Sequence, residues 1–164
     1  MAMAPVVAVD LVWDLPALQQ AIAADPQQWR PLVFTNGCFD LLHVGHIRYL
    51  QAAKALGKTL VIGLNSDSSV QALKGASRPI VPQQQRAEML AALKSVDGVV
   101  IFDETTASDL LLALQPDIYV KGGDYAPHTL PEMPAVMAVG AKLQLIQIEI
   151  PTSTSKIIAR IRES

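Results

Sequence analysis

Pairs of cysteines, long apolar runs and an excess of positive charge are all absent from this chain of 164 residues. Its single cysteine, Cys38, excludes an internal disulfide framework and fits a reducing cytoplasm. No apolar run reaches the roughly 18 residues that a membrane helix needs, and the N-terminus lacks the regions of a secretory signal. With 13 Lys and Arg against 15 Asp and Glu, the net charge of −2 provides no basic surface for nucleic acid. We therefore expect a cytoplasmic protein that binds neither membranes nor nucleic acids.

Apolar segments with the spacing of strands alternate with segments that have the spacing of helices, within a composition that is 51% hydrophobic and only 5% aromatic. The predicted strands are 32–34, 59–64, 98–102, 118–120 and 143–148. The predicted helices are 15–29, 44–56, 69–74, 83–94, 109–114, 136–140 and 156–162. This alternation predicts an α/β fold, a Rossmann-like doubly wound parallel sheet of about five strands. We expect a single domain over 1–164, with 1–12 as a flexible arm or an added edge segment.

Polar segments follow four of the predicted strands, at the point where each strand ends. They are 43–46 after the first strand, 65–67 after the second, 121–125 after the fourth and 153–155 after the fifth. Ligands of open α/β sheets bind at the carboxyl ends of the strands. The sequence therefore predicts that these four segments form one shared site.

Two histidines, His43 and His46, lie at the predicted junction between the first strand and the following helix, with Gly45 between them. Residues three apart share one face of a helix, so both imidazoles can face the same ligand. The free N–H groups and the dipole at a helix N-terminus favour an anion, and Gly45 has no side chain to hold it away. The pattern predicts a phosphate site in which both histidines stabilise the charge that develops in the transition state.

The segment His43-Val44-Gly45-His46 resembles the His-x-Gly-His signature of the nucleotidyltransferase superfamily, which includes cytidylyl- and adenylyltransferases. The wider run Gly-Cys-Phe-Asp-Leu-Leu-His-Val-Gly-His, residues 37–46, looks most like the branch that adenylylates heptose 1-phosphate. The resemblance extends over 32–161 through five motifs in the same order. It implies transfer of AMP from ATP to D-glycero-β-D-manno-heptose 1-phosphate with Mg²⁺ carried by ATP. It also implies a separate upstream sugar kinase, and members of the family commonly form homodimers.

Two further segments resemble motifs that contact the nucleotide in this family. Ser153-Thr154-Ser155 is similar to a helix start whose hydroxyl and N–H groups hold the β- and γ-phosphates, although Ser and Thr are also ordinary helix caps. The run Lys-Gly-Gly-Asp-Tyr at 121–125 resembles a hallmark of the heptose branch, although a turn alone explains Gly-Gly. The resemblance implies that the nucleotide lies against the backbone of Gly122 and Gly123.

Charged residues after the second strand resemble the Asn-x-Asp and Lys-Gly-x-x-Arg-Pro elements of the same family. Lys74 would act as a point charge near the transferred phosphate, and Arg78 would clamp an anion with two hydrogen bonds. Arg86, at a helix start, is a further candidate for binding phosphate. Asp40 either helps to hold magnesium or only orients its loop. Cys38 is interpreted as a packing residue, because this reaction needs no covalent step.

The predicted site thus has three groups of residues and no dedicated metal ligands. The predicted catalytic residues are His43, His46 and Lys74. The predicted nucleotide-binding residues are Thr35, Asn36, Gly37, Cys38, Phe39, Gly45, Lys121, Gly122, Gly123, Asp124, Ser153, Thr154 and Ser155. The predicted substrate-binding residues are Asp40, Asn65, Asp67, Arg78, Arg86 and Tyr125.

Two alternatives to the adenylyltransferase prediction remain at this point. The same fold can transfer CMP to glycerol 3-phosphate, or AMP to a flavin or another phosphate ester. A chain with this pocket can also be a nucleotide-binding sensor without turnover. A preference for CTP over ATP would indicate the first alternative. Pyrophosphate release that stays at background with every acceptor would indicate the second.

Overall fold

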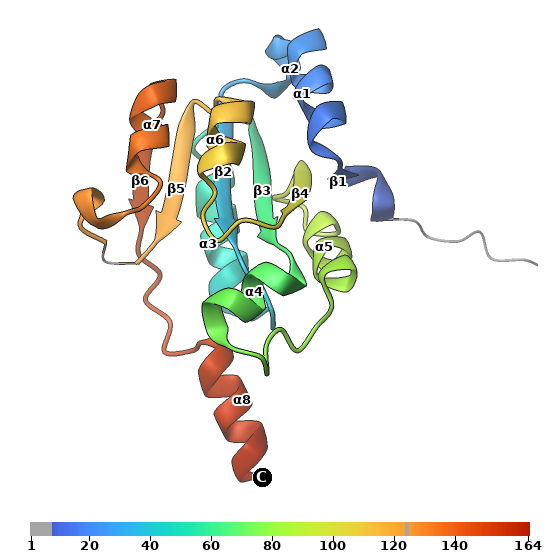
Figure 1. Ribbon diagram of the computed structural model, residues 1–164, viewed down its shortest axis with the longest axis vertical. Coiled ribbons are helices and arrows are strands. Elements are labelled where there is room, and N and C mark those ends of the chain that lie inside the picture. The colour runs from blue at the N-terminus through green and yellow to red at the C-terminus, as the bar shows by residue number, and fades with distance from the viewer. Residues whose placement is uncertain (1–7, 124) are drawn as a thin grey trace, which may run out of the picture.

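Six parallel strands form the centre of the computed structural model, which describes residues 8–123 and 125–164. Their order in the sheet is β1-β4-β3-β2-β5-β6, and every neighbouring pair is parallel. The strands are β1 Val12–Trp13, β2 Leu32–Gly37, β3 Thr59–Asn65, β4 Gly98–Phe102, β5 Ile118–Gly122 and β6 Lys142–Ile146. This confirms the predicted parallel α/β sheet of the Rossmann type (Figure 1). The sixth strand is the two-residue β1, which pairs with the edge of β4 and was predicted only as a peripheral segment.

Helices connect the strands and cover both faces of the sheet (Figure 1). The α-helices are α1 Leu15–Ala24, α2 Pro26–Trp29, α3 Val44–Lys54, α4 Asp67–Lys74, α5 Gln83–Ala91, α6 Ser108–Leu114, α7 Met133–Val139 and α8 Thr154–Glu163. Two short 3₁₀ helices, η1 Ala8–Leu11 and η2 Pro127–Thr129, complete the regular structure of the described residues. No helix in this part of the chain is both long and apolar enough to cross a bilayer.

The single helix predicted over 15–29 is wrong, because the structure divides it into α1 and α2 at Asp25. Asp25 leaves the helical conformation, with φ −141° and ψ 75°, and its carboxylate accepts the N–H of Gln28, so it caps a new helix. Pro26 follows at the first position of α2, where its missing N–H does no harm. The apolar spacing continues across this break, which is why periodicity alone predicted one helix.

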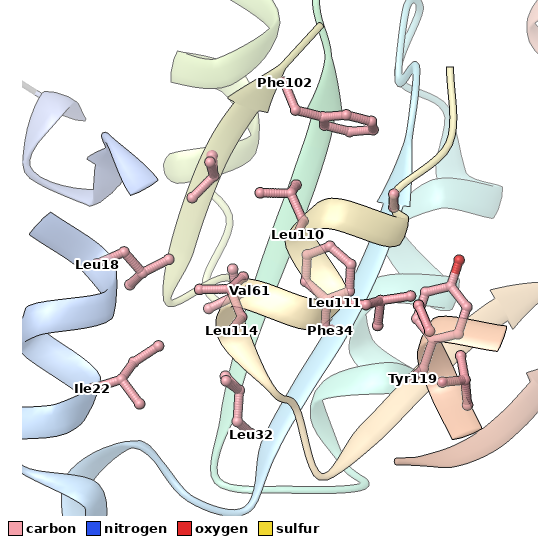
Figure 2. Packing of buried hydrophobic residues seen from close by; sticks show 14 of the residues in the cluster. Leu18, Ile22, Leu32, Phe34, Val61, Phe102, Leu110, Leu111, Leu114 and Tyr119 are labelled. Atoms are coloured by element: carbon pink, nitrogen blue, oxygen red, sulfur yellow. The ribbon is translucent and has the colours of Figure 1, made fainter. Parts of the chain in front are cut away.

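Two hydrophobic clusters lie on the two faces of the sheet. On one face, α1 and α6 pack against Leu32, Phe34 and Val61 of the central strands (Figure 2). Tyr119 joins this cluster from β5, with its ring stacked 6.0 Å from that of Phe34. On the other face, α3 and α5 pack against alternate residues of the same strands, such as Val33. Because both faces are covered, the residues of β3 are buried along its whole length.

The strand order places the ligand crevice between β2 and β5. From β2 the chain continues outward through β3 to β4, and it then returns to the other side of β2 to form β5 and β6. In open parallel sheets, the carboxyl ends of strands at such a reversal form the crevice in which ligands bind. In this chain the reversal brings 36–39 beside 121–123, with the start of α3 above them.

Candidate active site

The two histidines form reciprocal caps at the N-terminus of α3. The Nδ1 atom of His43 accepts the N–H of Gly45 at 3.2 Å, and the Nδ1 atom of His46 accepts the N–H of His43 at 3.2 Å. The two ring centroids are 3.9 Å apart. Because each Nδ1 accepts a backbone proton, the neutral rings must carry their own proton on Nε2. The cap therefore fixes both imidazoles as Nε2–H donors.

Burial keeps both imidazoles in the neutral form. It lowers the pKa of His46 to about 4, and the nearby His43 ring adds to the shift. The pKa of His43 is also lowered by burial. Protonation would in addition place a hydrogen on Nδ1 and break the cap. At neutral pH the pair therefore presents two uncharged donors beside the N–H groups that begin α3.

We expect the stability of the chain to fall as pH falls from 6.5 to about 4. In this interval the unfolded chain binds a proton at His46, with its ordinary pKa of 6.5, that the folded chain excludes. The free energy of unfolding, measured by urea titration at several pH values, should therefore decrease on acidification. In a His46→Gln variant, whose amide oxygen can accept the same N–H, the decrease should be smaller. Equal pH dependence of the two chains would contradict the neutral state of His46.

The first of two adjoining cavities lies at the crevice between β2 and β5 and has a volume of about 430 Å³. We call it the apolar pocket because aliphatic and aromatic side chains make up much of its wall. Its lining residues are Asn36, Gly37, Cys38, Phe39, His43, Gly45, His46, Tyr49, Lys121, Gly122, Gly123, Tyr125, Ile146, Ile148, Ile150 and Thr152. Gly123 has φ +103°, a conformation that L side chains rarely adopt, so the chain needs glycine at this wall.

The second cavity has a volume of about 280 Å³ and shares its histidine wall with the first. We call it the cationic pocket because Lys74 and Arg78 line it, together with hydroxyl groups at the start of α8. Its lining residues are Cys38, Phe39, Asp40, His43, His46, Lys74, Arg78, Ser153, Thr154 and Ser155. Two cations, a helix N-terminus and several hydroxyl groups are the chemistry of a phosphate site.

The start of α8 contributes to both structure and pocket. Ser153 caps the helix by accepting the N–H of Lys156 at 3.2 Å. Thr154 donates its hydroxyl to the carbonyl of Leu41 at 3.1 Å, which ties α8 to the loop before the histidines. The capping interpretation of these hydroxyls thus holds for Ser153, while all three residues from 153 to 155 line the cationic pocket.

Asp40 orients the loop that carries Arg78. Its carboxylate is 2% exposed and accepts the N–H groups of Ile80 and Val81 at 2.9 Å and the Nε–H of Arg78 at 2.6 Å. Burial alone would raise the pKa of Asp40, but these donors outweigh it and hold the pKa below its ordinary value. Because protein donors occupy both oxygens, Asp40 fits the orienting role and not that of a magnesium ligand.

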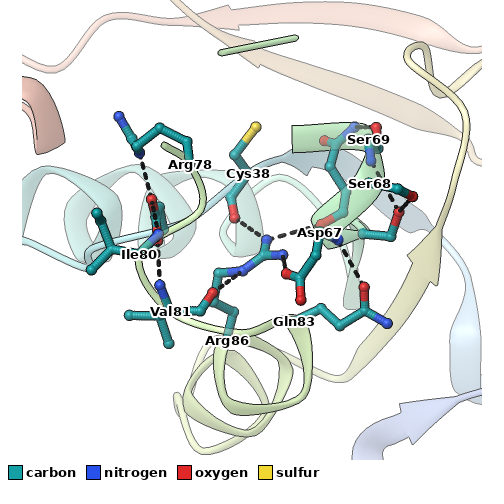
Figure 3. A network of polar contacts seen from close by, with 12 residues as sticks. Cys38, Asp67, Ser68, Ser69, Arg78, Ile80, Val81, Gln83 and Arg86 are labelled. Carbon is teal, nitrogen blue, oxygen red and sulfur yellow. Dashed lines mark hydrogen bonds and ion pairs between the residues drawn. The ribbon is translucent and has the colours of Figure 1, made fainter. Parts of the chain in front are cut away.

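Arg86 does not face either pocket, in contrast to the sequence prediction. Its side chain is completely buried, and its guanidinium donates to the carbonyls of Cys38, Asn65 and Val81 (Figure 3). The remaining nitrogen donates to Asp67 at 2.8 Å. Four of the five N–H donors are thus used within the protein, and the complete burial of the group keeps it away from a phosphate in either pocket. Arg86 instead joins the ends of β2 and β3 to the loop before α5.

Three other predicted site residues also act as supports. Thr35 is buried and its hydroxyl bonds to that of Tyr49 and to the carbonyl of Val120. Asn65 is buried and donates to Ser69, while the carboxylate of Asp67 accepts from Arg86. None of the three side chains lines either pocket. The alternation of side chains along a strand turns Thr35 and Asn65 away, and the ion pair with Arg86 turns Asp67 away. The predicted Asp124 lies outside the described residues.

Several pocket residues were not predicted from the sequence. Tyr49 lies one turn after His46 on the same face of α3, so helical spacing could have indicated it. Ile146, Ile148 and Ile150 come from the end of β6 and the segment after it, where no motif marks them.

Cys38 lines both pockets, and burial raises the pKa of its thiol although the cations nearby oppose this. A protonated thiol agrees with a packing role.

Comparison with known proteins identifies the family of this chain. Residues 34–160 match the model of the cytidylyltransferase-like family. The bifunctional protein HldE of Syntrophotalea carbinolica is 50% identical over 145 residues, and that of Geotalea uraniireducens is 50% identical over 149 residues. These alignments cover 88% and 91% of this chain but only 30% of each relative. The chain thus spans about a third of the length of these curated relatives.

A solved structure shares the fold. The lipopolysaccharide core biosynthesis protein of Thermoplasma volcanium superposes with a TM-score of 0.58 at 27% sequence identity. The superposition covers 73% of this chain and 97% of that protein. The matched segment, 34–160, contains the histidine pair and all of the residues that line the two pockets. The chain therefore belongs to the cytidylyltransferase-like family of nucleotidyltransferases.

Proposed function

We propose that this chain transfers AMP from ATP to D-glycero-β-D-manno-heptose 1-phosphate and releases pyrophosphate. The observation that carries the proposal is that the apolar pocket and the cationic pocket meet at one wall, formed by His43 and His46. A nucleoside suits the apolar pocket and phosphates suit the cationic one. The α-phosphoryl group of ATP, which joins the two parts, then lies against the two imidazoles.

The proposed reaction is a direct in-line displacement. An oxygen of the acceptor phosphate attacks the α-phosphorus, the bond from that phosphorus to the bridging oxygen breaks, and pyrophosphate leaves. The acceptor is already an anionic nucleophile, so no general base is needed. The Nε2–H groups of His43 and His46 donate to the oxygens on which charge develops, and Lys74 and Arg78 neutralise the phosphates.

Magnesium enters this proposal as part of the ATP substrate. The Asp40 carboxylate at the cationic pocket is already saturated by Arg78 and two backbone N–H groups. Phosphate oxygens and water are therefore the ligands that fit the ion here. The bound ion would neutralise negative charge on the phosphates during transfer. The proposal requires no metal site built by the protein.

The choice of nucleotide and acceptor rests on the resemblance and on the relatives. Lys121, Gly122, Gly123 and Tyr125 line the apolar pocket, and the run from Lys121 to Tyr125 resembles the motif of the heptose branch. The relatives at 50% identity are bifunctional HldE proteins, and this chain corresponds to about 30% of their length.

Incubation with ATP, Mg²⁺ and a panel of sugar 1-phosphates, read by mass spectrometry, tests this function. We expect an ADP-heptose and pyrophosphate from the heptose 1-phosphate and slower reaction with the other sugars. Calorimetric titration should show tighter binding of ATP than of CTP. Tighter binding of CTP would support a cytidylyltransferase instead. ATP binding without turnover for any acceptor would support a nucleotide sensor.

A further inference from the structure

A buried carboxylate, Glu132, lies behind the wall of the apolar pocket. It precedes α7 and is only 3% exposed. Its Oε1 atom accepts the N–H of Ala107 at 3.4 Å, while its Oε2 atom has no hydrogen-bond partner within the described part of the chain. Burying a carboxylate oxygen without a partner costs free energy, so the presence of this group calls for a reason.

Lys121 is the cation that faces this carboxylate. Its Nζ atom is 3.9 Å from Oε1 of Glu132, and its side chain is 18% exposed and lines the apolar pocket. The same ammonium donates to Oδ1 of Asn36 at 3.3 Å, which also accepts the hydroxyl of Tyr119 at 2.7 Å. An ammonium can only donate, so the amide oxygen of Asn36 must face it. The NH₂ group of Asn36 is left to serve a ligand in the pocket.

We infer that Glu132 is a positioning residue, which holds the Lys121 ammonium against Asn36 and directs both groups into the apolar pocket, toward the nucleotide bound there. This role rests on the proposed function for the identity of the ligand. It explains why a carboxylate with one unpartnered oxygen is kept under the pocket. The negative charge stabilises a cation that the pocket needs, and its attraction is strengthened because Glu132 is almost completely buried.

The electrostatic surroundings of Lys121 support this role. Burial lowers the pKa of its ammonium, whereas the carboxylate of Glu132 raises it. The ring of Tyr119, 5.9 Å from Nζ, provides a further favourable contact for the cation. Without the charge of Glu132, desolvation of the ammonium would be opposed only weakly, and a neutral lysine does not attract an anionic nucleotide.

Titration of MgATP into two Glu132 variants separates charge from packing. Glu132→Gln keeps the size and removes the charge, whereas Glu132→Asp keeps the charge and removes one methylene group. We expect the Kd for MgATP to rise about tenfold in Glu132→Gln and by less in Glu132→Asp. A role in packing alone predicts the reverse order. Glu88→Gln, which neutralises an exposed carboxylate on α5, is the matched control and should bind as the natural chain does.

A double-mutant cycle tests whether Glu132 acts through Lys121. In a Lys121→Met background, Glu132→Gln should leave the Kd unchanged, because the cation that it positions is gone. Additive effects of the two substitutions would overturn the inference. So would an unchanged Kd in Glu132→Gln alone, provided that the natural chain binds MgATP. If the natural chain binds MgCTP instead, ATP is not the nucleotide substrate. The natural chain, Glu132→Gln, Lys121→Met and the double variant are then compared in their Kd for MgCTP.

Discussion

Replacing His46 with Ala is expected to lower kcat by about 10²–10³-fold while the chain remains folded. The variant loses an Nε2–H donor that is fixed by the cap on His43 and held neutral by burial. Loss of one preorganised donor to a transition state has this magnitude. The binding of ATP should change much less, because the phosphoryl oxygens carry less charge before the reaction. Steady-state pyrophosphate release and calorimetric titration measure the two quantities separately.

His128→Ala is the matched control for this experiment. His128 is exposed on η2 and lines neither pocket, so the control removes an imidazole without touching the site. It should retain the natural kcat. Because His46→Ala also loses one hydrogen bond of the cap, its thermal melt must be compared with that of the natural chain. Near-normal turnover of folded His46→Ala would exclude the proposed role.

The geometry around His43 and His46 could be predicted from the sequence because it is local. A strand, a break and a helix start determine where residues three apart in the sequence lie. The parallel sheet could also be predicted, since the carboxyl ends of its strands must lie along one edge. These rules predicted one site from the segments that follow four strands. Residues of 43–46, 121–123 and 153–155 do line the two adjoining pockets, whereas Asn65 and Asp67 line neither.

The direction of long polar side chains could not be predicted in the same way. Asp40, Asn65 and Arg86 all lie close to the predicted site along the chain, yet each side chain turns inward. Their partners come from distant segments: Arg86 reaches the carbonyl of Cys38, which lies 48 residues earlier. Glu132 has no motif and lies in an irregular segment, so only the folded chain reveals that it faces Lys121. Tertiary packing decides such contacts, and periodicity carries no information about them.

Replacing Arg86 with Met is expected to lower the free energy of unfolding by about 3–5 kcal/mol. Met fills much of the same space but leaves three carbonyl oxygens, those of Cys38, Asn65 and Val81, without their donors. Arg86→Lys should restore only part of the loss, because one ammonium cannot reproduce the planar, multiply bonded guanidinium. Urea titration followed by circular dichroism measures the change.

The same pair of variants decides between the structural role of Arg86 and the predicted phosphate-binding role. Arg48→Met, which removes an exposed arginine on α3, is the control and should alter stability little. If Arg86 bound a phosphate, its variants would lose affinity for MgATP without a loss of stability. If Arg86 instead supports the fold, its variants lose stability. They then also lose affinity for MgATP, because the ends of β2 and β3 hold the loop of Cys38 and the start of α4 in place. Since all four hydrogen bonds of Arg86 are made within the protein, the second result is the one that the structure predicts.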